Sequence, residues 1–177
     1  MSRFLSSFRL VTGCLLLAAG ILMALPETGH ARPHHHRVHA ARGGGTHLFV
    51  LLGLGNNSPG LAEWGYRMQR AGIRTTVANH SDWPSLAQQA IAEYKSGRAS
   101  SIKIVGHSLG GSAASEMAAT LGQAGVPVQL VVSMDPPGGA SSSSNVRNFV
   151  NMVPRAGEDH SSMIVGQMRN LNAYVGR

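Results

Sequence analysis

Cysteine, aromatic residues and acidic residues are all scarce in this sequence. The single cysteine, Cys14, excludes an internal disulfide, so the fold is not a disulfide-held scaffold. Aromatic residues make up only 5%, whereas Gly and Ala are plentiful, and this mix favours close packing of helices on a sheet. With 177 residues, 43% of them hydrophobic, the chain suits one domain that buries roughly two-thirds of its unfolded surface.

The scarcity of acidic residues leaves the chain basic, with 15 Lys and Arg against 8 Asp and Glu. The arginines are scattered singly, form no run and do not alternate with aromatic residues. This distribution argues against nucleic acid as a partner and favours a solvated basic surface. Proximity to an anionic membrane surface stays open for a protein of this charge.

A long hydrophobic run is also missing, although a shorter one lies near the N-terminus. Leu10–Leu25 is about 16 residues long, less than the ~20 that span a bilayer as a helix. Arg3 and Arg9 precede this run, and the small residues around His30 follow it in Gly29-His30-Ala31. We therefore predict a signal peptide over residues 1–31 and an exported protein, periplasmic or extracellular, with an uncleaved membrane anchor as the alternative.

Residues 32–45 contain Pro33, four histidines and three consecutive glycines, and so cannot bury much apolar surface. We predict a flexible linker there. No carboxylate or cysteine accompanies the histidines to define a metal site, so we expect no metal and no cofactor. The folded domain is predicted to span residues 46–177.

Within that domain, short apolar runs alternate with helical patterns. The runs do not alternate with polar residues, which is typical of strands buried on both faces of a parallel sheet. We expect an α/β fold, a three-layer sandwich with a mostly parallel sheet of about five strands and helices on both faces. The predicted strands are Leu48–Leu52, Ile73–Ala78, Ile102–Val105, Val128–Met134 and Val146–Val153, and the predicted helices Leu61–Ala71, Pro84–Ser96, Leu109–Ala124 and Ser161–Val175.

The third run leads into Gly106-His107-Ser108-Leu109-Gly110-Gly111, a G-x-S-x-G motif between a strand and a helix. A serine at the tip of such a sharp turn exposes its hydroxyl, and the flanking glycines let the strand and helix approach each other. The N-terminus of the new helix points its N–H groups at any oxyanion formed there. This context predicts that Ser108 is a nucleophile.

A serine nucleophile needs a base and an acid that orients the base, expected in the chain order Ser, acid, His. The single histidine downstream of the motif is His160, in a loop before the last helix. Asp135 ends the fourth strand and lies at the carboxyl edge of the sheet, where ligand sites of such folds gather. Asp159 is adjacent to His160 and awkwardly placed to reach its ring, and Glu116 faces away. We therefore predict Ser108, Asp135 and His160 as the catalytic residues.

An oxyanion hole requires two N–H donors. We assign one to Leu109, the residue after the nucleophile, and the other to Leu54 in the loop after the first strand, with Gly55 as the fallback. His107 is expected to pack under the turn, and His80 lies in a loop at the same sheet edge.

The segment 106–111 resembles the nucleophile elbow of lipases and esterases in the α/β-hydrolase superfamily. Met134-Asp135-Pro136 and His160 before a terminal helix are similar to the acid- and base-bearing segments of that superfamily, over residues 46–175. The resemblance implies hydrolysis of a carboxylic ester or thioester through an acyl-enzyme. Leu52 stands where such proteins usually have a histidine, the opening antiparallel strands are missing, and only Pro136–Asn145 offers a flap.

The sequence thus predicts an exported serine esterase without a lid domain, monomeric and acting on a small-molecule or lipid ester. Two alternatives remain at this point. One is a non-catalytic binding or envelope protein that retains the fold, and the other is a thioesterase or peptidase with the same triad.

Overall fold

The computed structural model describes residues 44–176, and these form an α/β fold built on one parallel sheet. The five strands are β1 (Thr46–Leu52), β2 (Arg74–Asn79), β3 (Ser101–His107), β4 (Val128–Met134) and β5 (Val146–Met152). Their order in the sheet is β2-β1-β3-β4-β5, and every neighbouring pair is parallel. The predicted fold class is confirmed.

The central strands are buried because nearly all of their side chains are apolar. In β1, Phe49 and Leu51 point to one face of the sheet and Leu48 and Val50 to the other, and all four are fully buried. The edge strand β5 is more polar, and among its residues only Met152 is buried. The sheet is therefore a core element covered on both faces.

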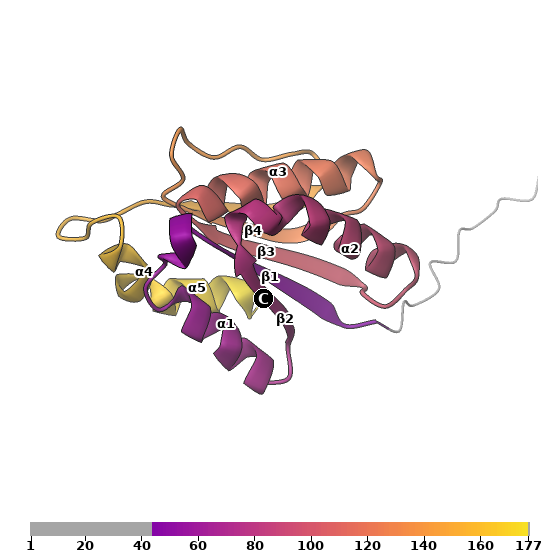
Figure 1. The fold of residues 1–177 in the computed structure, drawn as a ribbon, viewed down its shortest axis with the longest axis horizontal. Helices are drawn as coiled ribbons and strands as arrows, with labels where there is room; N and C mark the ends of the chain where they lie inside the picture. Colours follow the sequence, from indigo (N-terminus) through magenta and orange to yellow (C-terminus); the bar gives the residue numbers. More distant parts are fainter. Residues whose placement is uncertain (1–43, 177) are drawn as a thin grey trace, which may run out of the picture. The chain divides into compact units, whose positions relative to one another are not determined.

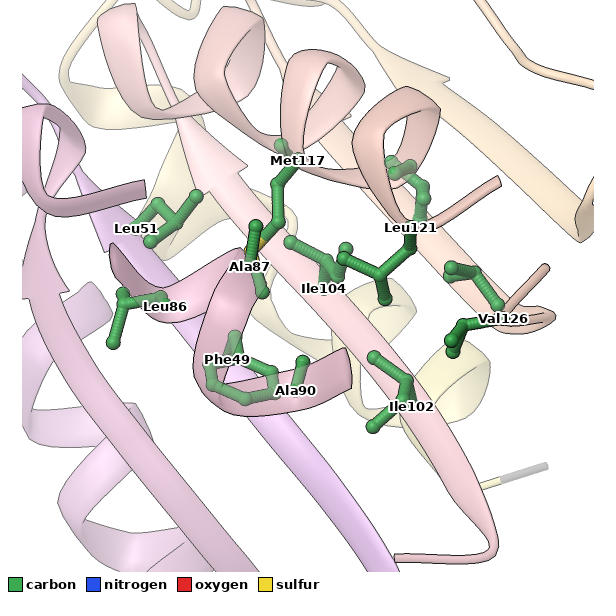
Figure 2. Close-up of a cluster of buried hydrophobic side chains, with 14 of the residues drawn as sticks. Phe49, Leu51, Leu86, Ala87, Ala90, Ile102, Ile104, Met117, Leu121 and Val126 are labelled. Atoms are coloured by element: carbon green, nitrogen blue, oxygen red, sulfur yellow. The ribbon is translucent and has the colours of Figure 1, made fainter. Parts of the chain in front are cut away.

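Helices cover both faces (Figure 1). One face carries α2 (Trp83–Lys95) and α3 (Leu109–Gln123), and the other carries α1 (Leu61–Arg70), α4 (Ser162–Gly166) and α5 (Met168–Val175). Figure 2 shows the first of these two cores, where alanines of α2 let the helix lie close to the aliphatic side chains of β1, β3 and α3. No helix within residues 44–176 is long and apolar enough to cross a bilayer.

The last predicted helix, Ser161–Val175, is wrong in one respect, because it is two helices that meet at Gln167. The Gln167 side chain is buried and donates hydrogen bonds to Val153 O (2.8 Å) and to Glu158 Oε2 (2.7 Å). Both acceptors belong to the preceding loop, and the two bonds hold the chain at the break. The apolar stripe nevertheless continues across it, since Ile164, Leu171 and Val175 are all buried.

The connection from β4 to β5 has no helix of its own and follows α3. Asn145 donates hydrogen bonds to Ala118 O (3.0 Å) and Val126 O (2.9 Å), and Ser112 Oγ contacts Pro137 O at 3.4 Å. The segment Pro136–Asn145, the candidate flap, is thus held to α3 at both of its ends.

The N-terminal predictions lie mostly outside the described residues. The signal peptide and linker residues 32–43 belong to that part. Gly44 and Gly45, at the end of the predicted linker, pack against the domain: a Cβ on Gly44 would lie 2.4 Å from the Arg98 carbonyl carbon, and Gly45 O accepts a hydrogen bond from Ser100 N (3.1 Å).

A buried polar cluster joins α2 to the amino-terminal ends of β1 and β2. Glu93 is 2% exposed; one of its oxygens lies 2.6 Å from His47 Nδ1 and the other accepts hydrogen bonds from Arg74 and Gln89. Burial lowers the pKa of His47. His47 Nε2 is 2.9 Å from Thr76 Oγ1 on β2, so the ring connects all three elements.

We expect Glu93→Ala to lower the free energy of unfolding by about 3 kcal/mol, because it leaves the buried His47 ring without its acceptor and the Arg74 guanidinium without its carboxylate. The measurement is urea denaturation at pH 7. Glu116→Ala, on the exposed face of α3, is the matched control and should change it by less than about 0.5 kcal/mol. Equal effects in the two variants would contradict a stabilising role for the cluster.

Candidate active site

The G-x-S-x-G turn joins β3 to α3 in a space that admits no side chain at its two outer glycines. A Cβ on Gly106 would lie 1.9 Å from Gly110 O, and one on Gly110 would lie 2.1 Å from Leu51 O. Both neighbours are backbone atoms, which have little freedom to move aside. The strand and helix therefore approach each other as the sequence predicted, and Ser108 stands at the tip with φ 57° and ψ −128°.

Backbone strain is concentrated at this edge of the sheet. Among residues 44–176, the non-glycine residues with positive φ are Asn56 (64°), Ser108 (57°) and Asp135 (44°), which follow β1, β3 and β4. Such conformations cost roughly 1–3 kcal/mol each and persist where surrounding structure fixes them. Hydrogen bonds from Ser108 N to Met134 O and from Asp135 N to Met152 O, both 2.8 Å, provide that support.

His160 is paired with Asp135. The two side chains meet at 2.6 Å between His160 Nδ1 and Asp135 Oδ2, although they are 25 residues apart in sequence. Asp135 extends from the carboxyl end of β4, and His160 lies in the loop between β5 and α4. A carboxylate on Nδ1 fixes the tautomer that leaves Nε2 free to accept a proton.

The other acidic candidate, Asp159, has a different task. Its Oδ1 accepts hydrogen bonds from the N–H groups of Ser161 (2.9 Å) and Ser162 (2.7 Å) at the start of α4. Hydrogen bonds from Ser162 and Ser161 lower the pKa of this carboxyl, so it is ionised at neutral pH. Asp159 is thus a helix-capping residue.

Ser108 is connected to this pair through its chain neighbour His107, whose ring centroid is 4.6 Å from that of His160, and through its N–H, which donates to Met134 O next to Asp135. Within residues 44–176 no hydrogen bond joins the Ser108 hydroxyl to His160, and such bonds often form only in the substrate complex. The structure therefore gathers all three predicted catalytic residues at one edge of the sheet.

The predicted oxyanion loop lies against Ser108, the predicted nucleophile. It forms the short 3-10 turn η1 (Leu54–Asn56), and an ideal Cβ on the preceding Gly53 would come within 3.2 Å of Ser108 Cβ. The N–H groups of Leu54 and Leu109 have no acceptor in the described part of the chain, and the same is true of Gly55. The two predicted donors are therefore available for an oxyanion.

Sequence reasoning missed a polar network beneath the turn. Gly53 N donates to Ser58 Oγ (2.9 Å), Ser58 Oγ lies 3.0 Å from His107 Nδ1, and His107 Nε2 lies 2.8 Å from His160 O. His107 does pack under the turn, with 1% of its surface exposed, and burial lowers its pKa. No local pattern around Ser58 signals this contact, because the two residues are 49 positions apart.

His80 lies in the 3-10 turn η2 (His80–Asp82) at the carboxyl end of β2, next to Asn79, which donates a hydrogen bond to Asn56 of η1 (2.8 Å). In residues 44–176 no group of three or more His, Cys, Asp or Glu is arranged to hold a metal ion. The four linker histidines lie outside the described residues.

This fold, with a strained serine between β3 and α3 and a His–Asp pair at the same sheet edge, defines an α/β-hydrolase. Residues 37–151, more than half of the chain, match the family model of the thioesterase domain. The chain therefore belongs to the thioesterase domain family, within the α/β-hydrolase superfamily, and is a hydrolase of the esterase and thioesterase type. Neither the curated proteins nor the solved structures contain a match.

The pairing at His160 generates a direct test. Asp135→Asn should lower kcat by about 10³–10⁴ because the amide no longer favours the productive tautomer of the imidazole. Asp159→Asn should retain nearly full activity, since an asparagine oxygen still caps α4. Turnover of a soluble ester by the two purified variants measures this. Loss of activity in the second variant alone would mean that the acid is Asp159.

Proposed function

We propose that this protein is an exported serine hydrolase that cleaves carboxylic esters through an acyl-enzyme on Ser108. The observation that carries the proposal is the His160–Asp135 pair beside a serine held at positive φ. A binding protein would have no need to hold strained backbone and a polarised histidine at the same sheet edge. Strain of this kind clusters at sites where it serves chemistry.

The first half of the reaction acylates the serine. Ser108 Oγ forms a bond to the substrate carbonyl carbon as its proton passes to His160 Nε2, while Asp135 accepts from Nδ1–H and stabilises the imidazolium. The carbonyl electron pair moves onto oxygen, which the N–H groups of Leu54 and Leu109 bind. The bond to the leaving group then breaks, and His160 returns the proton to the departing oxygen.

The second half returns the enzyme to its starting state. Water attacks the acyl carbon as His160 takes one of its protons, and the same two N–H groups bind the oxyanion. The bond from the acyl carbon to Ser108 Oγ then breaks, the serine oxygen recovers a proton from His160, and the carboxylic acid leaves. No cofactor enters these steps, because proton transfer and charge stabilisation come from the side chains and backbone named.

Thioesters are the second candidate substrate class, and the family match favours them. A thiolate is a better leaving group than an alkoxide, so the same arrangement serves both reactions. Three exposed apolar side chains on segments that follow the strands also favour an acyl group over a polar substrate. Leu54 is 71% exposed in η1, Val153 follows β5 with 55% exposed, and Val165 of α4 is 65% exposed.

A fluorescent fluorophosphonate tests the proposed nucleophile. We expect covalent labelling of the full-length protein and none of Ser108→Ala, because the reagent reacts only with an activated serine. Circular dichroism confirms that both proteins are folded. A folded parent that is not labelled would leave a non-catalytic binding protein as the better interpretation.

Export is part of the same proposal, and rests on Arg3, Arg9 and the apolar run Leu10–Leu25. The processed protein is expected to act as a monomer in the periplasm or the medium. The mass of the labelled protein outside the cytoplasm should correspond to a chain that begins at Arg32. Recovery of an intact N-terminus in the membrane fraction would instead indicate an uncleaved anchor.

A pair of substrates with the same short acyl group, one an oxoester and one a thioester, separates the two candidates. Because Pro136–Asn145 is tied to α3 and is too short for a lid domain, we expect both substrates to be cleaved at concentrations below their solubility limits. The ratio of kcat/KM values then assigns the preferred class. A rate that rises only above the solubility limit of the substrate would contradict an open, lidless site.

A further inference from the structure

His107 occupies the variable position of the serine turn and yet makes two long-range hydrogen bonds. One ring nitrogen contacts Ser58, which in turn accepts from Gly53 N in front of the oxyanion loop. The other contacts the backbone carbonyl of His160. A single side chain therefore connects the segments that carry the nucleophile, the base and one oxyanion donor.

The partners fix where the protons are. A carbonyl oxygen only accepts, so His107 Nε2 must carry the hydrogen in its bond to His160 O. In the neutral ring Nδ1 is then an acceptor, which the Ser58 hydroxyl satisfies while Ser58 Oγ accepts from Gly53 N. Burial lowers the pKa of His107 and favours this neutral form.

His107 bonds to the backbone carbonyl oxygen of His160. No other hydrogen bond among the described residues uses this oxygen. The loop around His160 is otherwise exposed, with the side chain of the histidine itself about half exposed (49%). Although Glu158 and Asp159 anchor the neighbouring residues of the loop, the bonds to His107 and Asp135 are the two that reach His160 itself among the described residues. A displacement of about 1 Å at such a residue costs on the order of 10² in rate.

We propose that His107 is a positioning residue that fixes the base His160 through its Nε2–H and the oxyanion loop through its Nδ1. This inference rests on the proposed function, because it concerns the geometry of the same triad. The bond to the His160 carbonyl places the base, and the bond to Ser58 places Gly53 and thereby the Leu54 N–H.

Substitution of His107 by glutamine or by asparagine distinguishes its hydrogen bond to His160 O from its hydrogen bond to Ser58. Glutamine places its amide nitrogen near the position of Nε2 and retains a donor to His160 O. Asparagine reaches only to the position of Nδ1 and retains an acceptor for Ser58. The variants are His107→Gln, His107→Asn and His107→Ala, with Ser58→Ala for the second bond and Glu116→Gln as an exposed control.

We expect His107→Ala and His107→Asn to lower kcat and the rate of fluorophosphonate labelling by about 10²-fold, with KM changed less than about twofold. His107→Gln should restore the labelling rate to within about tenfold of the parent. Ser58→Ala should lower kcat by about tenfold, because it acts on one oxyanion donor indirectly. Melting temperatures identify any variant that is unfolded, and the comparison of Gln with Asn stands if alanine is not tolerated.

Equal rates in the Gln and Asn variants, whether both normal or both low, would overturn the proposal, because the ring would then act only by filling space. The proposed function has its own readout in the same experiment. If the parent is neither labelled nor active, the serine hydrolase assignment fails; if the parent is active and the His107 variants match it, only the positioning role fails.

Discussion

The close approach of β3 and α3 is the constraint on which the site depends. The strand enters the turn and the helix leaves it so near to β1 that Gly110 has the Leu51 carbonyl where a Cβ would be, at 2.1 Å. Ser108 adopts φ 57° at this sharp turn, at the edge of the sheet where β3 ends. Within residues 44–176 the first N–H of α3, that of Leu109, has no acceptor, as the proposed oxyanion donor requires. The positions of the proposed nucleophile and of one proposed oxyanion donor thus follow from one packing requirement.

Parallel pairing then brings the remaining parts together. Since β1, β3 and β4 are neighbours with the same direction, the segments after them emerge at one edge of the sheet. These segments begin at Gly53, Ser108 and Asp135, which are far apart in sequence. Ser108 and Asp135 are tied to the next strand by backbone bonds, from Ser108 N to Met134 O and from Asp135 N to Met152 O. Gly53 N instead donates to the side chain of Ser58. His160 alone comes from a loop beyond the sheet, and it needs contacts that the strand order does not supply.

This division explains how far the sequence alone could go. The parallel sheet, the serine turn and Asp135 follow from local patterns, because buried strands are continuously apolar and their ends share an edge. The break at Gln167 has no such pattern, since a buried bond to Val153 O produces it and the apolar stripe runs through it unchanged. The network of Ser58 and His107 was also invisible, because a common turn serine reveals nothing about a partner in another strand. Catalytic roles remain predictions, whereas the spatial gathering of the residues is observed.

The two adjacent histidines illustrate why burial matters to the proposed chemistry. During the reaction His160 would become an imidazolium, and a second cation 4.6 Å away would oppose it. His107 is enclosed beneath the turn, and burial lowers its pKa, so it remains uncharged at neutral pH. His160 is about half exposed, and Asp135 binds its Nδ1 at 2.6 Å, which leaves Nε2 as the ring nitrogen that faces a substrate in the proposed reaction. One imidazole is thereby restricted to hydrogen bonding and the other is available for proton transfer, a separation that arises from their depth in the fold rather than from their sequence context.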